Sequence, residues 1–537
     1  MMNPYLALEG VSYVLPDGRT LFTDINGTFD QRRTGLVGRN GVGKSLLARI
    51  LAGRVQPSIG RCLRSGGVYY LAQQVAPPAN ATVASLAGVR QTLDALARIE
   101  AGSSAPQDFD AVGDRWDIRQ QLRGALEHHG LGHLDADTPA DRLSGGEAMG
   151  VALTGALLSD ADFLILDEPS NHLDRPHRRA LIAQLKNWSR GLLVVSHDRQ
   201  LLEAMEHIVE LSSLGLRSYG GNYTFYATSK THERQNALQE FERRKLERRR
   251  EEQAMVKQRE RQTRRQARGN RRGKETNQAK ILLDRQKERS QGSVGRLHQQ
   301  QVIARQRLDQ QVREAAQHMQ NDAPITLHSF SVAQAAQRRV VELDGVELPF
   351  VPKAMRHISI CLNGQQRVGM TGPNGCGKST LLKVLAGRLH PLAGVCKIMA
   401  EAIYLDQRLA NLAPERTALD QMQTANSTAT EGDLRMRLAQ LDLDAQKITM
   451  PSGSLSGGER LKAALACVLY ADPPPQLLLL DEPSNHLDLP STQALEAMLR
   501  GYQGTLVVVS HDDVFMDNLG LTERLLATGQ GWCLEPW

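Results

Sequence analysis

Hydrophobic and polar positions alternate in the opening segment of the chain. Residues 6–29, LALEGVSYVLPDGRTLFTDINGTF, alternate apolar and polar side chains on both sides of the turn-forming sequence PDG. A period of two places every second side chain on the same face of a strand. The segment therefore predicts two short strands of an antiparallel sheet.

Other apolar runs are continuous and end in polar residues. Residues 163–166 (FLIL) lead into Asp167 and Glu168, and residues 192–195 (LLVV) lead towards His197. Short continuous runs are typical of strands that are covered on both faces, as in parallel sheets. Ligands of open α/β sheets bind at the carboxyl ends of such strands. The pattern therefore predicts a buried parallel sheet that presents these three polar residues at its ligand-binding edge.

In the middle of the chain, helix-forming residues dominate and apolar residues are sparse. Almost no Gly or Pro interrupts residues 229–268, whereas residues 267–275 (ARGNRRGKE) supply two glycines and an asparagine. Straight-chain residues favour helix, and a Gly/Asn cluster favours a turn. Helical composition resumes from Thr276 to about Gln320, apart from QGSVG at residues 291–295. The pattern predicts an antiparallel hairpin with arms of roughly 50–60 Å.

The base of this hairpin should be held by one apolar stripe, because apolar residues of the second arm are spaced by four, three and four positions. These residues are Leu308, Val312, Ala315 and Met319. Leu238 and Phe241 of the first arm could face them. Towards the expected turn arginine replaces the apolar residues, so the arm should have a packed base and a basic tip.

A phosphate-binding motif follows the first antiparallel segment. GRNGVGKS matches G-x-x-x-x-G-K-[ST] between a predicted strand and the helical sequence LLARILAG, which is the context that the motif requires. Its glycines let backbone N–H groups surround phosphate oxygens in front of a helix N-terminus. Lys44 would reach the β- and γ-phosphates, and Ser45 would bind Mg²⁺. The motif consists of Gly38, Arg39, Asn40, Gly41, Val42, Gly43, Lys44 and Ser45.

A second glycine-containing motif, LSGGE, begins a predicted helix. Ser144 and Glu147 fit a capping box, in which each side chain satisfies a free backbone N–H group. Taken alone this pattern indicates only a well-capped helix. Gly145 and Gly146, however, would let a phosphate approach the positive end of that helix.

The residues at the strand ends have the chemistry of a nucleotide hydrolase. Asp167 would hold Mg²⁺ through water or Ser45, and Glu168 would polarise the attacking water. His197 follows a strand as the two acids do, so a contact with the γ-phosphate is favoured over a merely structural histidine. Gln73 follows another predicted strand in VYYLAQQ.

The second half of the chain repeats these elements in the same order. The interval from Lys44 to Gln73 equals that from Lys378 to Gln407, and the interval from Asp167 to His197 recurs after Asp481. The P-loop to LSGGE interval is 22 residues longer in the first half, and the extra residues are expected between Ala76 and Pro139, in a helical subdomain. The second set comprises Gly372, Pro373, Asn374, Gly375, Cys376, Gly377, Lys378, Ser379, Thr380, Gln407, Ser456, Gly457, Gly458, Glu459, Asp481, Glu482 and His511.

Each half therefore resembles an ATP-binding cassette domain, for which LSGGE is the signature. The resemblance implies that the signature serine of one domain, Ser144 or Ser456, closes over the nucleotide held by the other. It implies ATP and Mg²⁺ as cofactors, with catalytic roles for Glu168, Glu482, His197 and His511. The implied Mg²⁺ ligands are Ser45, Gln73, Asp167, Ser379, Gln407 and Asp481.

Some positions depart from that family's pattern. An aromatic residue stacks on adenine before the P-loop in the family, and Tyr13 is the matching position in the first half. Leu348 falls there in the second half, with Phe350 nearby, so adenine stacking at that site is in doubt. Cys376 stands where serine is usual, and its oxidation could block the site. AMG follows the first signature and RLK the second, so the two sites could differ in rate.

Charge is concentrated in the middle segment. Residues 228–323 carry 25 Lys+Arg against 13 Asp+Glu, so this segment is +12 within a chain of net charge +6. A concentrated basic arm indicates nucleic-acid binding, and arginine can donate two hydrogen bonds to one phosphate. A solvated spacer between the two halves is the alternative.

The remaining composition excludes several classes. No apolar run approaches the roughly 18 residues that a membrane helix needs. The opening residues contain no basic segment followed by an apolar core, so we expect no signal peptide and a cytoplasmic protein. The six cysteines have no CxxC spacing, which argues against a zinc site, a disulfide framework or an Fe–S cluster.

Two cassettes in one chain, no membrane span and a basic helical linker resemble the ABC-F family of translation factors over essentially the whole chain. The expected domains are cassette 1 at residues 1–227, the hairpin linker at 228–323 and cassette 2 at 324–537. The resemblance implies a monomer whose cassettes pair within the chain, without a transmembrane partner. No extension is expected after the second cassette.

The family resemblance also implies a mechanism. The ATP-bound form binds the exit-site side of the ribosome, its linker contacts P-site tRNA and large-subunit rRNA, and hydrolysis releases it. Such a protein is a translation factor or an antibiotic-resistance ribosome protection protein. A cassette-type ATPase that acts on DNA in repair or recombination, through the same basic arm, is the alternative.

Overall fold

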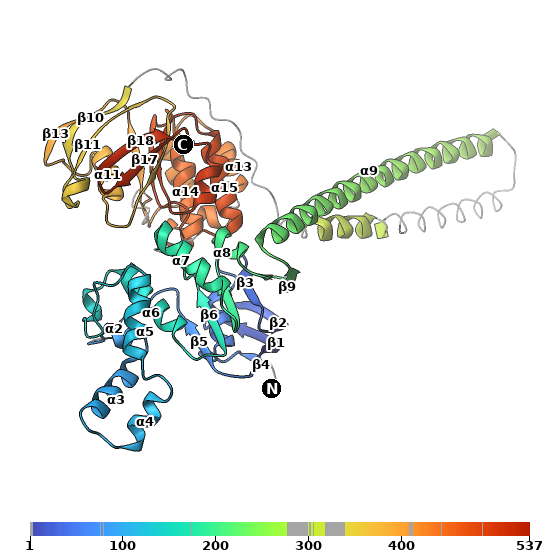
Figure 1. The fold of residues 1–537 in the computed structure, drawn as a ribbon. Helices are drawn as coiled ribbons and strands as arrows, with labels where there is room; N and C mark the ends of the chain where they lie inside the picture. Colours follow the sequence, from blue (N-terminus) through green and yellow to red (C-terminus); the bar gives the residue numbers. More distant parts are fainter. Residues whose placement is uncertain are drawn as a thin grey trace. The chain divides into compact units, whose positions relative to one another are not determined.

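The computed structural model describes residues 4–75, 77–78, 80–171, 173–275, 299, 302–303, 305–316, 339–406, 412–441, 443–485 and 487–537. The chain forms two compact units, one made of Met1–Phe225 with Ile325–Trp537 and one made of Tyr226–Pro324. The first unit contains the same α/β arrangement twice (Figure 1). We call residues 4–225 cassette 1, residues 339–537 cassette 2 and the second unit the arm.

Each cassette begins with a three-stranded antiparallel sheet. In cassette 1, β1 (Leu6–Val14) is the central strand between β2 (Thr20–Phe29) and β4 (Ile59–Arg64). The alternating opening segment thus forms the predicted antiparallel pair. In cassette 2 the order is β11-β10-β13, with bounds β10 (Arg339–Glu347), β11 (His357–Asn363) and β13 (Ala393–Ile398).

A six-stranded sheet carries the predicted ligand-binding edge. In cassette 1 its order is β5-β6-β7-β3-β8-β9, and all neighbours are parallel except β8 and β9. Every residue of β6 and of β7 is buried, as the continuous apolar runs predict. The strands are β3 (Arg33–Val37), β5 (Val68–Leu71), β6 (Phe163–Asp167), β7 (Gly191–Val195), β8 (His207–Ser212) and β9 (Gly215–Gly220).

The sheet of cassette 2 has the equivalent order, β14-β15-β16-β12-β17-β18. Its strands are β12 (Arg367–Thr371), β14 (Ala402–Leu405), β15 (Leu477–Asp481), β16 (Thr505–Val509), β17 (Glu523–Thr528) and β18 (Gly531–Pro536). The repeated topology confirms the internal duplication that the motif spacing predicts.

The helices of cassette 1 include the extra segment expected before the signature. Between β5 and the signature helix lie α2 (Val83–Leu86), α3 (Arg90–Glu100), α4 (Pro106–Val112), α5 (Ile118–His128) and η1 (Ala140–Arg142). The others are α1 (Lys44–Leu51), α6 (Gly145–Leu157), α7 (Arg175–Lys186) and α8 (Arg199–Glu203). The corresponding part of cassette 2 has shorter helical content, as the residue count predicts.

In that part of cassette 2 the helices are α12 (Ala418–Ala425), α13 (Glu431–Gln440), η3 (Lys447–Thr449) and η4 (Ser452–Ser454). The remaining helices of cassette 2 are η2 (Lys353–Met355), α11 (Lys378–Leu385), α14 (Gly457–Leu469), α15 (Leu489–Gly501) and α16 (Asp513–Asn518).

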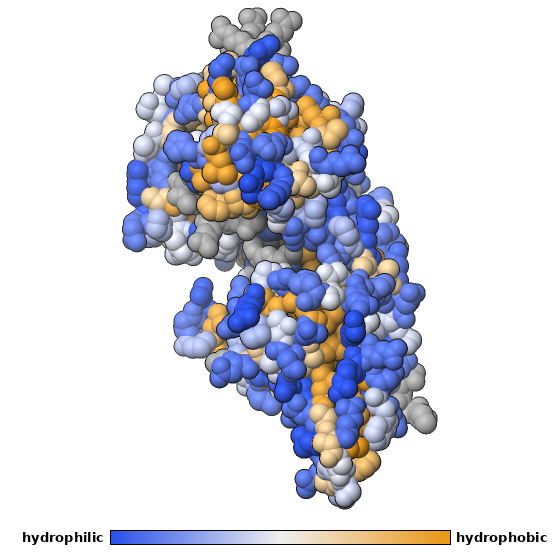
Figure 2. Space-filling model, turned by 60° about the vertical axis from the view of Figure 1, so that its left-hand side comes forward, coloured by the Kyte–Doolittle hydropathy of each residue, from blue (hydrophilic) through white to orange (hydrophobic). Residues whose placement is uncertain are grey.

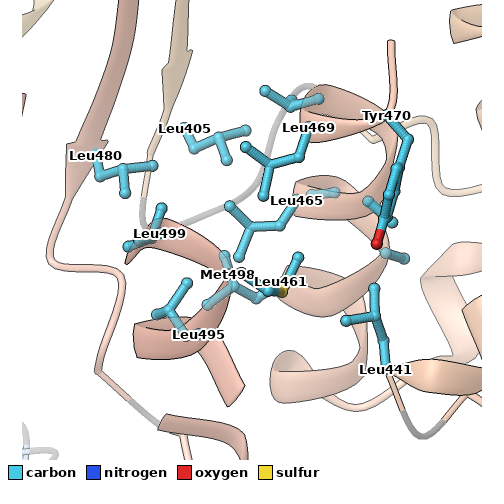
Figure 3. Packing of buried hydrophobic residues seen from close by; sticks show 14 of the residues in the cluster. Leu405, Leu441, Leu461, Leu465, Leu469, Tyr470, Leu480, Leu495, Met498 and Leu499 are labelled. Atoms are coloured by element: carbon cyan, nitrogen blue, oxygen red, sulfur yellow. The ribbon is translucent and has the colours of Figure 1, made fainter. Parts of the chain in front are cut away.

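Leucine packing fixes the signature helix of cassette 2 against the sheet. Leu465 and Leu469 of α14 point towards Leu405 of β14, and Met498 of α15 lies beside Leu461 (Figure 3). Burial of each such side chain contributes about 1.5–3 kcal/mol relative to exposure. Leu478 and Leu480 of β15 belong to the same cluster, so the helix that begins at the signature also packs with the strand that ends at Asp481.

The arm begins as one long helix, α9 (Tyr223–Glu275), of 53 residues, which corresponds to about 80 Å. Residues 305–316 form a second helical stretch, and Arg248 Nη1 lies 3.4 Å from Asp309 Oδ1 between the two. Ala315 is buried, and Leu308 and Val312 are partly buried, as the stripe predicts. Met319 lies outside the described residues. Leu238 does not close this stripe, because it is 49% exposed.

The turn predicted at residues 267–275 is wrong, because α9 continues to Glu275. A glycine in a helix costs about 1 kcal/mol relative to alanine, which a helix of this length and composition tolerates. The hairpin itself stays a prediction, since residues 276–298, which would follow the end of α9, lie outside the described residues.

The space-filling view shows a mostly polar face, on which apolar residues form narrow strips among charged side chains (Figure 2). Among the residues that the structure describes, no helix combines the length and the apolarity needed to cross a bilayer.

Candidate active site

The two P-loops share one conformation. The three glycines of the first loop, at 38, 41 and 43, have φ values of 154°, 79° and 101°, and those of the second have 155°, 76° and 101°. At Gly41, where φ is positive, a side chain would be strained even though the space is open. The curled backbone leads directly into α1 and α11, so each loop presents a helix N-terminus to an anion.

Each P-loop lysine is held against its own loop. Lys44 Nζ donates to the carbonyls of Gly38 and Arg39 at 2.8 and 3.0 Å, and Lys378 Nζ makes the same pair of bonds in cassette 2. Burial lowers the pKa of Lys44 below its usual value. A buried ammonium group beside the backbone N–H groups of the P-loop is suited to binding a phosphate group.

The strand-end aspartates have the surroundings of Mg²⁺ ligands. Ser45 Oγ donates to Asp167 Oδ1 at 3.1 Å, so the two expected ligands of cassette 1 are adjacent. Asp481 Oδ1 is buried and has no hydrogen-bond partner among the described residues. Hydroxyl and carboxylate oxygens are the ligands that Mg²⁺ accepts, with phosphate and water completing its shell. The donor set therefore fits Mg²⁺ bound together with a nucleotide.

Two tyrosines, absent from the expected site, fix these aspartates. Tyr70 donates from its hydroxyl to Asp167 Oδ2 at 3.2 Å, and Tyr404 donates to Asp481 Oδ2 at 3.0 Å. Both tyrosines stand three residues before the glutamine of their half, so comparison of VYYLAQQ with IYLDQ could have identified them. The other carboxylate oxygen accepts from Ser45 in Asp167 and has no partner among the described residues in Asp481.

Glu168 and Glu482 occupy the same strained position in the two halves. Their φ values are 50° and 51°, in the left-handed region, and the two residues are 8% and 7% exposed. Burial raises the pKa of Glu168 above its ordinary value and raises that of Glu482 to about 7. A carboxylate whose pKa is near neutrality can accept a proton from a water molecule.

The two histidines lie beside these glutamates. His197 Nε2 is 3.7 Å from Glu168 Oε1, and His511 Nε2 is 3.4 Å from Glu482 Oε1. Burial lowers the pKa of His197 and lowers that of His511 to about 3, so both rings are neutral near pH 7. A neutral ring can donate one hydrogen bond to a phosphate oxygen.

Each P-loop shares a cavity with the signature of the other cassette. The first cavity, of about 370 Å³, has Lys44 and Ser456 in its lining. The second, of about 1030 Å³, has Lys378 and Ser144. Both volumes suit a small-molecule ligand. The predicted head-to-tail arrangement is therefore present.

The cavities contain most but not all of the candidate residues. The first is lined by Asn40, Gly41, Gly43, Lys44, Ser45, Gln73, Glu168, His197, Ser456 and Gly457. The second is lined by Ser144, Gly145, Gly146, Glu147, Pro373, Asn374, Gly375, Gly377, Lys378, Ser379, Thr380, Asp481, Glu482 and His511. Outside both linings are Tyr13, Gly38, Arg39, Val42, Asp167, Gly372, Cys376, Gly458 and Glu459. Gln407 lies outside the described residues.

Two aspartates, one at the end of each SNHLD sequence, connect the cassettes. Asp488 Oδ2 accepts a hydrogen bond from the backbone N–H of Asn40 at 2.8 Å, and Asp174 Oδ2 accepts one from Asn374 at 3.4 Å. Each aspartate also caps the helix that follows it, α15 or α7. The P-loop of one cassette is thus bonded to a rigid element of the other.

The signature helices begin with complete capping boxes. The side chains of Ser144 and Ser456 accept from the backbone of the glutamate three residues later, and each glutamate accepts from the serine N–H. The predicted capping is confirmed. The glutamates have different neighbours, because His133 contacts Glu147 at 3.1 Å and Lys447 contacts Glu459 at 3.1 Å.

The aromatic positions differ from expectation. Tyr13 packs against Phe22 with ring centroids 6.4 Å apart and is absent from the lining of the first cavity. Leu348 is fully buried and cannot face a nucleotide. Phe350, which sequence spacing did not select, is 91% exposed and lines the second cavity.

Cys376 is less vulnerable than its position in the P-loop suggests. It is 3% exposed and packs in the core of cassette 2. Burial raises the pKa of its thiol, which disfavours the reactive thiolate.

The comparisons agree with this geometry. The ABC transporter family model matches residues 22–171 and 355–485. The ATP-binding protein Uup of Haemophilus influenzae is 31% identical over 528 residues, covering 92% of this chain and 74% of that protein. The chain is therefore an ATPase of the ATP-binding cassette class and binds nucleotide.

Within that class, the chain belongs to the ABC-F family of tandem-cassette proteins. The tylosin resistance ATP-binding protein TlrC of Streptomyces fradiae is 30% identical, covering 94% of each chain. The energy-dependent translational throttle protein EttA of Mycobacterium tuberculosis (strain H37Rv) is 31% identical, covering 90% of this chain and 84% of that protein.

Solved structures support the fold. An archaeal ribosome recycling factor in complex with a ribosomal stalk protein superposes with a TM-score of 0.54 at 19% identity, covering 98% of this chain and 89% of the other. At this identity the likeness concerns the tandem-cassette architecture alone.

Proposed function

We propose that the chain hydrolyses ATP with Mg²⁺ at both composite cavities and that this cycle controls its attachment to the ribosome. The observation that carries the first part is the meeting of each P-loop with the opposite signature in one cavity. Lys44 and Lys378 would bind the β- and γ-phosphates. Mg²⁺ would supply charge neutralisation on these phosphates, held by Ser45 with Asp167 and by Ser379 with Asp481.

The glutamates would act as general bases on the attacking water, and the histidines would orient the γ-phosphate. Support comes from the burial and raised pKa of Glu168 and Glu482 and from the nearby rings of His197 and His511. Both glutamates keep a strained backbone conformation, which costs on the order of 1–3 kcal/mol and is typical of catalytic positions. Signature contacts with the γ-phosphate would favour cassette closure while ATP is intact.

The basic arm would contact ribosomal RNA and P-site tRNA in the closed state, and hydrolysis would release it. Support comes from the net charge of +12 on residues 228–323. It also comes from two relatives that bear the names translational throttle protein and tylosin resistance protein. The proposal puts the chain in the cytoplasm as a monomer, with residues 228–323 as a helical hairpin and Phe350 as an adenine-facing residue.

Sedimentation with bacterial ribosomes tests this proposal. We expect the double variant Glu168→Gln, Glu482→Gln to bind ATP, to hydrolyse it at least about 100-fold more slowly and to co-sediment with ribosomes only when ATP is present. Trimming residues 243–290 should abolish co-sedimentation while leaving ATP binding intact.

Substituting exposed arginines tests the arm without shortening it. The arm variant replaces Arg250, Arg261 and Arg264 by Gln, and the control replaces three exposed cassette arginines, Arg19, Arg61 and Arg123. In the Glu168→Gln, Glu482→Gln background, the arm changes should weaken ribosome binding. The slope of the logarithm of the binding constant against the logarithm of the salt concentration should become less steep by about 2. Equal binding by arm and control variants, or ATP-dependent binding to duplex DNA instead, would contradict the proposed target.

A further inference from the structure

Arg178 of cassette 1 lies between the two candidate ATP sites. Its Nη1 donates to the backbone carbonyl of His511 at 2.8 Å, across the cassette interface. Its Nε is 3.2 Å from Asp198 Oδ2, in the residue that follows His197. The side chain is 10% exposed and lines both cavities. One guanidinium thus contacts the histidine loops of both cassettes.

Cassette 2 has no equivalent arginine. Arg178 stands four residues after Asp174, and the residue four positions after Asp488 is Thr492. The Thr492 hydroxyl donates to the Asp488 carbonyl on its own helix at 3.1 Å, so it makes a local bond. The His511 loop therefore receives a hydrogen bond from the cationic side chain of Arg178. The counterpart of Arg178 in cassette 2 is the short hydroxyl side chain of Thr492.

The two histidines also differ in how many hydrogen bonds hold them, and His511 is the better held. The ring of His511 contacts Asn374 Oδ1 at 3.1 Å, and its carbonyl accepts from Arg178. In the part of the chain that the structure describes, neither ring nitrogen of His197 has a hydrogen-bond partner. His511 is thus fixed at ring and backbone, whereas the ring of His197 is not fixed.

We propose that Arg178 is a positioning residue that holds the His511 loop in its reactive geometry and makes the site of Lys378 the faster of the two ATP sites. The inference rests on the proposed function, since it takes both cavities to be hydrolytic. Preorganised hydrogen-bond donors lower the reorganisation needed at the moment of reaction, and small displacements of such groups reduce rates strongly.

Asp198 explains why the effect falls mainly on one site. Its Oδ1 accepts from the backbone N–H groups of Gln200 and Leu201, so α8 holds it without help from Arg178. Loss of the guanidinium would therefore leave the loop of His197 capped, whereas the His511 carbonyl would lose its donor.

Single-site variants test the inference by steady-state ATP hydrolysis. Glu168→Gln leaves only the site of Lys378 active, and Glu482→Gln leaves only the site of Lys44. We expect the first variant to be the faster. Adding Arg178→Thr to it should lower kcat by about tenfold with KM changed less than about threefold, and Arg178→Lys should restore part of the loss. In the Glu482→Gln background the same change should cost less than about threefold.

The control is Lys186→Ala, an exposed cation at the end of α7 that should leave both rates unchanged. Equal losses at the two sites, or equal rates of the two single variants with native Arg178, would overturn the inference. If neither glutamine substitution lowers ATP hydrolysis, the proposed catalytic glutamates are wrong instead, which separates the two failures. Arg178→Lys keeps the test valid should Arg178→Thr prevent folding.

Discussion

Phe350 has a backbone conformation that is strained and an apolar ring that is exposed to solvent, and both cost free energy. Its φ is 59°, a region that bulky residues rarely adopt, and nearly the whole side chain faces solvent. Strain of this kind amounts to on the order of 1–3 kcal/mol and is typical of ligand-contacting positions. Because the ring lines the cavity of Lys378, we infer that the strain presents it to the nucleotide base.

Phe350→Ala should weaken ATP binding at that site by about 1–3 kcal/mol, the usual contribution of an aromatic ring stacked on a base. Titration of the Glu168→Gln, Glu482→Gln protein with ATP would detect a weaker second binding event. Phe350→Tyr, which keeps the ring, is the matched control and should bind normally. Unchanged affinity in the alanine variant would mean that the base lies elsewhere.

At the residue scale, the sequence motifs predicted those site residues whose positions are set by a single loop or strand. The P-loops, the strand-end acids and the histidines all follow from local sequence, because a loop or a strand places them directly. Phe350 was named only as a neighbour of the aligned Leu348, because β10 ends at Glu347, after which the chain turns Leu348 inward and Phe350 outward. Arg178 was missed because its partner, His511, is 333 residues away in the chain.

Among the elements, helix α6 depends on a glycine where it crosses the chain after α2. A Cβ on Gly155 would lie 2.3 Å from the carbonyl oxygen of Ala87, a backbone atom that cannot move without shifting the helix. Ser144 stands at the N-terminus of the same helix, so a shift of α6 at this contact would also move the first signature.

Gly155→Ala should therefore destabilise cassette 1 by about 1–3 kcal/mol, the usual cost of overpacking. Gly124→Ala in α5 is the control, because nothing lies within 4 Å of its Cβ position. That change should stabilise the helix by about 0.5–1 kcal/mol, since alanine is the better helix former. Urea denaturation of the two variants would measure both effects. A stabilised Gly155→Ala protein would show that the crossing is not as close as described.

The elements also show where sequence patterns predict structure well and where they do not. Period and composition predicted the antiparallel pair, the buried parallel strands and the helical character of α9. They failed at the end of α9, since two glycines in a strongly helix-forming sequence reduce stability without ending the helix. Leu238 was expected as a residue that could face the stripe, but it is 49% exposed, because the facing residues depend on the register between two helices, which composition does not determine.

For the molecule as a whole, the duplication predicted that two similar cassettes pair head to tail, yet their interface is not symmetric in charge. Several ion pairs between the cassettes run from an arginine of cassette 1 to an acid of cassette 2. The pairs are Arg199 with Glu496 at 2.8 Å, Arg175 with Asp513 at 2.7 Å and Arg179 with Asp513 at 3.6 Å. The spacing of the repeated motifs cannot predict the direction of these ion pairs. The arginines and acids that form them stand at positions where the two halves differ in sequence. Two copies of one cassette would bring like charges together, which favours pairing within one chain.

The pair between Arg199 and Glu496 allows this polarity to be tested. Both side chains are more than 90% buried, so breaking the pair leaves an uncompensated charge that costs about 3–5 kcal/mol. Arg199→Glu alone and Glu496→Arg alone should each lower ATP hydrolysis at least about tenfold, because paired cassettes complete both sites.

The exchanged double variant should recover most of that loss, since it restores opposite charges in the same place. Steady-state ATPase rates of the four proteins form a double-mutant cycle, and a coupling energy above about 1.5 kcal/mol would confirm a direct pair. Asn518 shares Glu496 at 3.0 Å, so Asn518→Ala should be measured alongside to separate its contribution. Additive losses in the double variant would mean that each charge acts on its own cassette. In that case cavity shape, rather than the direction of charge, would select the partner within the chain.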